Sequence, residues 1–213
     1  MMDVQRINGY TDPRFPQEVL HQHGAFLADG VPWAFRVVSD REAVVTTAQP
    51  ITPEALAELA EGFRFYAGHI TDFYDEAGTL LLSLPPVERW EVDIDSLQPS
   101  QFSVDEDKRA AVDGFLHTAA DLVIPVTELA DGTLCTMDGH TRLYAAWRKG
   151  IRRAMVFRAA DQDMAAGIAD FAAEARKRGI FHIRDMALLS HEEQEEKWDG
   201  WCDAYFARQA EGK

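Results

Sequence analysis

The stretch Leu134–Gly150, with the sequence LCTMDGHTRLYAAWRKG, predicts a buried strand that ends at Asp138-Gly139 and is followed by a helix. Its first four residues are apolar or β-branched, and a glycine permits backbone angles that other residues resist. Thr141–Lys149 suits a short helix, and Gly150 supplies the stop. The rest of the chain is expected to be arranged around this strand, turn and helix.

The turn carries the chemistry. At a helix start the first backbone N–H groups have no intrahelical partner, and the helix dipole adds partial positive charge, so anions are attracted there. Arg142 can add a forked cationic donor suited to phosphate, and Gly139, His140 and Thr141 complete a phosphate-binding set. Asp138 has the opposite sign and would repel a bare anion unless a metal ion, or a positive or hydroxylated substrate group, lay between them. In a nucleotide-dependent enzyme that metal ion would be Mg²⁺. The alternative is a structural turn whose polar groups satisfy one another.

Elements on both sides of this stretch predict a mixed α and β unit. Ser103 and Glu106 have the spacing of a capping box, which predicts a helix after them, and Asp131-Gly132 is a strong hairpin signal. The predicted strands are Arg89–Ile94, Leu122–Leu129 and Ala154–Phe157.

Three further segments are expected outside this unit, which we place at 87–160. Residues 1–17 are expected to be an irregular arm, and 18–86 a small α+β unit with short strands at Ala25–Leu27, Val31–Val38 and Ala43–Thr47. In that unit Thr52 predicts a helix that Gly62 ends, followed by a hairpin formed by Phe63–Tyr74 and Thr79–Leu84.

Residues 161–213 are expected to be helices that pack on the 87–160 unit. The first, Asp163–Arg178, has an inward face that includes Met164 and stops at Gly179. Ser190 and Glu193 form a second capping box. The helix after it carries an apolar stripe of Trp198, Trp201, Cys202, Tyr205 and Phe206.

The composition limits the partners. The chain has 213 residues and a formal charge of −15, which should repel nucleic acid over most of the surface. The one dense basic patch, Arg148–Arg153, is interpreted as cations that match a helix C-terminus. Cys135 and Cys202 suggest neither a disulfide framework nor a zinc site, and we find no leader or membrane-spanning run, so a cytoplasmic location is expected.

The order of elements resembles the superfamily shared by the N-terminal domain of the partition protein ParB, sulfiredoxin and the free serine kinases. The matching pieces are Val92–Pro99, Asp105–Thr118, Ile124-Pro125-Val126, Asp131-Gly132 and the turn Asp138–Arg142. The resemblance implies an α+β fold with a ParB/sulfiredoxin-like mixed sheet. It also implies that the turn binds nucleotide phosphates, with ATP, ADP or CTP as the nucleotide.

The resemblance also assigns roles to single residues. The kinase-like members have the turn nearest to this one, which makes Asp138, His140 and Glu91 the candidate catalytic residues. Ser100 and Gln101 stand where substrate would bind, although the kinase-like members have a glutamate after the preceding proline.

Three functions remain open on the sequence. The first is a nucleotide-dependent phosphotransferase or NTPase that acts on a small molecule, since phosphoryl transfer depends mainly on positioning and charge stabilisation. The second is a nucleotide-sensing or adaptor module that binds a protein partner without turnover. The third is a ParB-like DNA-binding protein or nuclease, which the negative charge disfavours.

Overall fold

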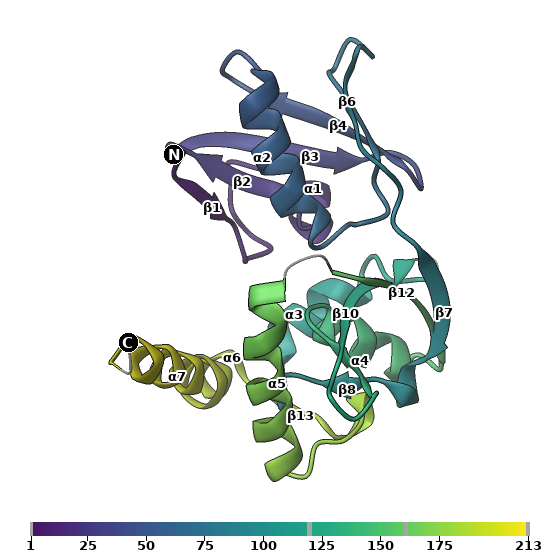
Figure 1. Cartoon of the computed structure of the whole chain (residues 1–213), viewed down its shortest axis with the longest axis vertical. Coiled ribbons are helices and arrows are strands. Elements are labelled where there is room, and N and C mark those ends of the chain that lie inside the picture. Colours follow the sequence, from purple (N-terminus) through teal and green to yellow (C-terminus); the bar gives the residue numbers. More distant parts are fainter. Residues whose placement is uncertain (1, 119–120, 160–161, 212–213) are drawn as a thin grey trace. The chain divides into compact units, whose positions relative to one another are not determined.

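The computed structural model describes residues 2–118, 121–159 and 162–211, without the side chains of 162–166. The described chain divides into two compact units (Figure 1). The first holds the residues up to Trp90 together with 123–125 and 157–159, and the second holds the others. The expected boundary at residues 160 and 161 lies outside the described residues.

The first unit contains a six-stranded mixed sheet in the order β1-β2-β3-β4-β5-β6. The pair β4–β5 is parallel and the other neighbours are antiparallel. The strands are β1 (Val4–Arg6), β2 (Ala25–Ala28), β3 (Val31–Val37), β4 (Glu42–Thr47), β5 (Asp72–Tyr74) and β6 (Leu80–Ser83).

Two helices of this unit contribute to two separate cores. Helix α2 (Pro53–Arg64) contributes Leu59 and Phe63 to a core with Phe26 and other sheet residues. Helix α1 (Gln17–His21) packs in a second cluster that includes Leu27. Because successive residues of a strand point to opposite faces, β2 is covered on both sides.

The structure corrects three expectations in this unit. The 1–17 segment contains β1, which pairs with β2. Gly62 lies inside α2, because contacts of the buried Phe63 with the sheet outweigh the weak helix propensity of glycine. The strand expected from Phe63 begins only at Asp72, although the hairpin with β6 is confirmed.

A five-stranded sheet in the order β7-β12-β10-β11-β8 belongs mainly to the second unit. Only the ends of three of its strands, at residues 89–90, 123–125 and 157–158, are assigned to the first unit. Strands β10 and β11 form the predicted antiparallel hairpin, whereas β11 and β8 are parallel, so this sheet is also mixed. The strands are β7 (Arg89–Asp93), β8 (Gln98–Pro99), β10 (Val123–Glu128), β11 (Leu134–Thr136) and β12 (Arg153–Arg158). The predicted strand Arg89–Ile94 is confirmed as β7, and a 3-10 helix (Ile94–Ser96) separates it from β8.

The helices of the second unit begin close to the predicted positions. They are α3 (Glu106–Asp113), α4 (His140–Arg148), α5 (Gln162–Lys177) and α6 (His191–Gln194), which continues through the π-helix η4 (Glu195–Asp199) into α7 (Gly200–Glu211). The capping box of Ser190 and Glu193 is confirmed. The box of Ser103 and Glu106 is wrong, because Ser103 lies in β9 (Ser103–Asp105) and Asp105 caps α3.

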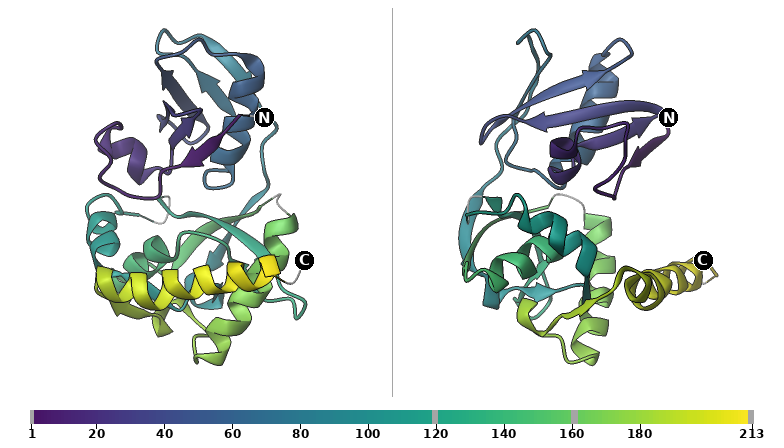
Figure 2. Two further views of the ribbon diagram at one scale, coloured as in Figure 1. Left: turned by 90° about the vertical axis from the view of Figure 1, so that its left-hand side faces the viewer. Right: turned by 180° about the vertical axis from the view of Figure 1, so that it is seen from behind.

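The C-terminal helices pack through the predicted aromatic stripe. The Trp198 and Trp201 rings contact Phe102 and Phe171, and Tyr205 contacts Phe171. Strand β13 (Ala187–Leu189) pairs with β9 before the α6–α7 arm, which Figure 2 shows from two further sides. The predicted inward role of Met164 lies outside the described side chains. No helix among the described residues is long and apolar enough to cross a membrane.

Candidate functional site

The turn between β11 and α4 has the predicted backbone geometry. Gly139 is the N-cap of α4 with φ 81° and ψ 16°, a left-handed conformation that glycine adopts without strain. The Thr136 hydroxyl donates to the Asp138 carbonyl oxygen at 2.6 Å, which holds the backbone of the residue before Gly139. No side chain caps the start of α4, so its first N–H groups are not satisfied in that way.

His140 is a structural acceptor in this turn. Its ring is buried, and its Nε2 accepts the Ser100 backbone N–H at 3.1 Å. The Ser100 hydroxyl donates to the Thr136 carbonyl oxygen at 2.8 Å, so the residue after β8 is joined to both β11 and α4. Burial lowers the pKa of His140 to about 4, and the ring is neutral at pH 7.

Arg142 is the cationic group of the turn. The residue is only 8% exposed, and its Nη2 lies 3.4 Å from the Asp138 Oδ2. That distance is longer than the 2.7–2.9 Å typical of a strong charge-assisted hydrogen bond. The Arg142 Nε is buried and has no acceptor among the described residues. The guanidinium therefore keeps unused donor capacity beside the helix start.

The other predicted site residues divide into two groups. Ser100 and Asp138 lie at the turn, with Gln101 and Thr141 half-buried next to them in sequence. Glu91 lies on β7, three strand spacings from β11, which corresponds to roughly 14 Å. Its carboxylate is paired with Arg153 at 2.9 Å. The fold thus joins Ser100 to His140 and Asp138 to Arg142, and it leaves Glu91 on another strand.

Asp138 is the one residue that the sequence predicts to hold a metal ion. Within the part of the chain that the structure describes, no three His, Cys, Asp or Glu side chains gather in a way that could hold a metal ion. Cys135 offers no thiolate, because burial raises its pKa to about 12. A Mg²⁺ ion at this turn would have to take most of its ligands from substrate phosphates and water.

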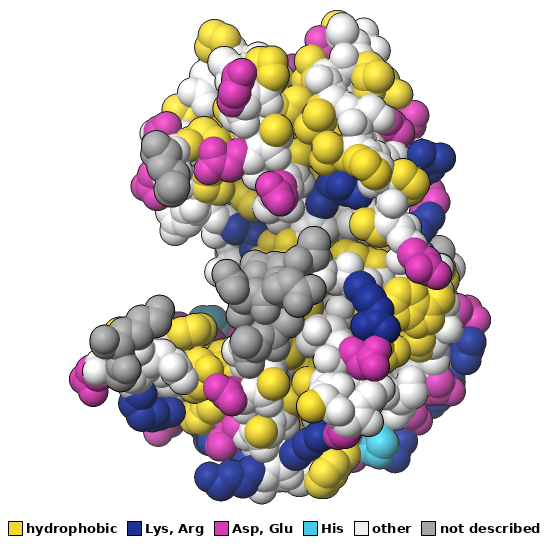
Figure 3. All heavy atoms as spheres, viewed as in Figure 1, with side chains coloured by type: hydrophobic (Ala, Val, Ile, Leu, Met, Phe, Trp, Pro, Cys, Tyr) yellow, Lys and Arg dark blue, Asp and Glu magenta, His cyan; other side chains and the backbone are white. Residues whose placement is uncertain are grey.

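The basic segment after α4 is largely used within the fold. Lys149 Nζ donates to the carbonyl oxygens of Asp113 and Leu116, both at 2.8 Å. Arg152 donates to the Trp147 carbonyl oxygen, and Arg153 pairs with Glu91. On the face that Figure 3 shows, described Lys and Arg side chains are scattered among Asp and Glu. This arrangement agrees with the helix C-terminus interpretation of the patch.

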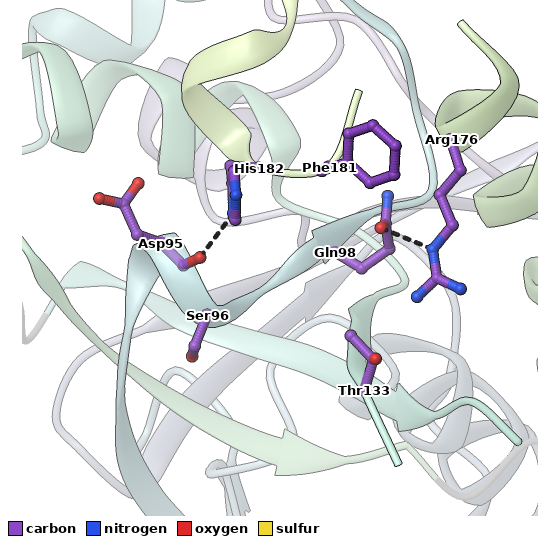
Figure 4. A pocket seen from close by; sticks show the side chains of 7 residues that line it. All are labelled: Asp95, Ser96, Gln98, Thr133, Arg176, Phe181 and His182. Atoms are coloured by element: carbon purple, nitrogen blue, oxygen red, sulfur yellow. Dashed lines mark hydrogen bonds between the residues drawn. The ribbon is translucent and has the colours of Figure 1, made fainter. Parts of the chain in front are cut away.

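A cavity of about 460 Å³ lies elsewhere in the second unit. It is lined by Asp95, Ser96, Gln98, Thr133, Arg176, Phe181 and His182 (Figure 4). Local sequence patterns did not group these residues into a site, because they are separated by up to 87 positions along the chain. The Phe181-His182 pair after the glycine that ends α5 is the one local signal.

Comparisons with known proteins give no family. No protein-family model matches the chain, and no curated protein matches it. Among solved structures, the chain is similar to protein Atu1540 from Agrobacterium tumefaciens, with 15% sequence identity and a TM-score of 0.32. That match covers 47% of this chain and 62% of the other chain.

Proposed function

We propose that the second unit is a ParB/sulfiredoxin-like domain that binds the phosphates of a nucleotide at the start of α4, without using His140 or Glu91 as catalysts. One observation carries the proposal. The Arg142 guanidinium is nine-tenths buried beside an uncapped helix start, and its Nε has no acceptor among the described residues. A buried donor without a partner costs stability, and a bound phosphate removes that cost.

The local chemistry favours phosphate as the ligand. The first N–H groups of a helix and the positive end of its dipole attract anions, and the planar guanidinium matches two phosphate oxygens at once. The ion pair between Arg142 and Asp138 is long, at 3.4 Å, and therefore weak. Arg142 can exchange this contact for one with a phosphate. The succession of β7, α3, β10, hairpin, β11, turn and α4 supports the superfamily resemblance.

Binding without turnover is favoured over catalysis by the state of the candidate catalysts. His140 already accepts the Ser100 N–H through Nε2 and is too weak a base to hold a proton near pH 7. Glu91 is paired with Arg153 on another strand. A nucleotide-sensing or adaptor role therefore fits the geometry best.

A phosphotransferase or NTPase is the second candidate. The observation in its favour is Asp138, whose carboxylate is half-buried beside Arg142. Mg²⁺ is commonly held by one or two carboxylates and substrate phosphates, and Asp138 has the right charge and place for this. A phosphate-release assay with ATP, ADP and CTP in the presence of Mg²⁺ tests this candidate, and turnover that Asp138→Asn abolishes would favour it over pure binding.

Isothermal titration calorimetry with ATP, ADP, CTP and inorganic pyrophosphate, with and without Mg²⁺, tests the main proposal. We expect at least one of these anions to bind the unmodified protein and Arg142→Ala to weaken that binding by about a hundredfold or more. The affinity of Arg142→Lys should lie between those of the unmodified protein and Arg142→Ala, because lysine keeps the positive charge but lacks the planar guanidinium that contacts two oxygens at once.

Arg153→Ala is the matched control. It removes the same charge from an exposed ion pair of the same unit, so affinity should stay within about twofold of the unmodified protein. The proposal fails if none of the four anions binds, or if Arg142→Ala and Arg153→Ala weaken binding equally.

A further inference from the structure

The cavity shown in Figure 4 is separate from the start of α4. Asp95 and Ser96 precede β8, and Thr133 precedes β11, so the cavity lies at the amino ends of these two parallel strands. The turn at Asp138-Gly139 follows the carboxyl end of β11. The volume of about 460 Å³ is within the range of small-molecule sites.

Arg176 is a fixed donor in this cavity. Its Nε donates to the Gln98 Oε1 at 2.9 Å, and its Nη1 donates to the Asp131 Oδ2 at 2.8 Å. Gln98 is 2% exposed, and its amide nitrogen donates to the carbonyl oxygens of Pro99 and Ile180. These bonds hold the guanidinium on two sides and leave its Nη2 without an acceptor among the described residues. The charge of Arg176 is balanced by Asp131.

Phe181 exposes a large apolar ring to solvent at the edge of the cavity. The side chain is 52% exposed, although its backbone is held firmly. The Asp185 carboxylate accepts the N–H groups of Phe181 and His182, at 3.1 and 2.9 Å. A rigid, solvent-facing aromatic ring at the edge of a cavity is suited to stacking on a planar ligand.

His182 supplies an acceptor. Its Nδ1 lies 2.8 Å from the Asp95 carbonyl oxygen, and a carbonyl can only accept, so Nδ1 carries the proton. In the neutral ring Nε2 is then the acceptor. The Asp95 carboxylate is turned away from Gln98 and pairs with Arg184 at 2.9 Å. The carboxylates of Asp95 and Asp131 are therefore each paired with an arginine.

We propose that this cavity binds a planar heterocycle of the nucleobase type that carries ring carbonyl and ring N–H groups. The ring stacks on Phe181, a carbonyl oxygen accepts from the Arg176 Nη2, and a ring N–H donates to the His182 Nε2. A neutral heterocycle suits the site better than a phosphate, because Asp131 already balances the single cation.

Calorimetric titration with uracil and hypoxanthine tests the site. We expect both to bind, and Phe181→Ala to weaken binding about tenfold or more, since stacking of a base on an aromatic ring contributes strongly to affinity. Phe206→Ala is the matched control, because this phenylalanine of α7 is 59% exposed and does not line the cavity. It should leave the affinity unchanged.

Two further titrations separate this site from the phosphate site. Arg142→Ala should keep uracil binding, and excess pyrophosphate should not displace uracil. Dihydrouracil, which keeps the polar groups but is puckered, should bind about tenfold more weakly than uracil. The inference is overturned if uracil and hypoxanthine do not bind, if Phe181→Ala binds them as well as Phe206→Ala does, or if dihydrouracil binds as tightly as uracil.

Discussion

Helices α3 and α4 begin in opposite ways within the same unit. At the start of α3, the Asp105 carboxylate accepts the N–H groups of Asp107 and Lys108 and also pairs with His191 at 2.7 Å. At the start of α4, Gly139 has no side chain to cap the helix, and the Asp138 carboxylate lies 3.4 Å from the buried Arg142 and does not cap the helix. We call the start of α3 the closed helix start, because the Asp105 carboxylate caps it. We call the start of α4 the open helix start, because no side chain caps it.

The difference shows how a binding site differs from a stabilising contact. Burial favours the neutral form of Asp105, but hydrogen bonds from His191, Lys108 and Asp107 outweigh it and hold the pKa below its usual value. Arg142, in contrast, has a buried Nε with no acceptor among the described residues. Native proteins satisfy nearly all buried polar groups, so such an exception calls for an explanation, and a bound anion is one.

The largest expected effect is on the closed helix start. Asp105→Ala removes the cap and a charged hydrogen bond, and should lower the free energy of unfolding by about 3 kcal/mol. Urea denaturation followed by circular dichroism measures this change. Asp105→Asn keeps a cap acceptor and should lose less. Equal losses for the two variants would mean that the cap contributes little.

The pH dependence of the open helix start follows from His140. Its pKa is about 4 in the folded protein and near 6.5 in the unfolded chain, so between these values the unfolded chain binds the extra proton. Its contribution is complete above pH 6.5 and decreases as the pH falls, by about 3 kcal/mol at pH 4.

His140→Gln isolates this contribution, because glutamine can accept the Ser100 N–H and does not titrate. Urea denaturation of both proteins at pH 7, 6 and 5 should show a smaller loss of stability in the variant. Parallel curves for the two proteins would exclude His140 as the titrating group.

Gly139→Ala tests the backbone of the open start. With φ at 81°, an alanine there should cost about 1–2 kcal/mol in the free energy of unfolding and also weaken nucleotide binding, because the turn must shift. Gly132→Ala in the β10–β11 hairpin is the matched control, with the same φ of 81°. It should cost a similar amount of stability and leave binding unchanged.

The smallest effect on stability should come from Arg142→Met. The variant removes an unsatisfied buried donor and keeps most of the apolar stem, so the free energy of unfolding should change by less than about 1 kcal/mol, or increase. Thermal and urea unfolding measure this. A loss near that of Asp105→Ala would place Arg142 among the structural residues and remove the contrast between the two helix starts.

Local signals predicted much of the fold because they act over a few residues. The Asp131-Gly132 hairpin, the Ser190 and Glu193 capping box and the helix after Gly139 are all confirmed. The cap of α3 was misplaced from Asp105 to Ser103, because Ser103 is instead held by Gln194 at 2.8 Å, a residue 91 positions away. Sequence spacing cannot register a contact of that kind.

The sequence by itself determined the turn at Gly139, since only a residue without a side chain adopts that conformation freely and since helix starts attract anions wherever they occur. Tertiary structure decided what the neighbouring residues do. Burial against Ser100 makes His140 a neutral acceptor, the strand order separates Glu91 from the turn, and packing leaves the Nε of Arg142 buried without an acceptor among the described residues. Burial and long-range partners set protonation and hydrogen bonding, and neither is encoded by local spacing.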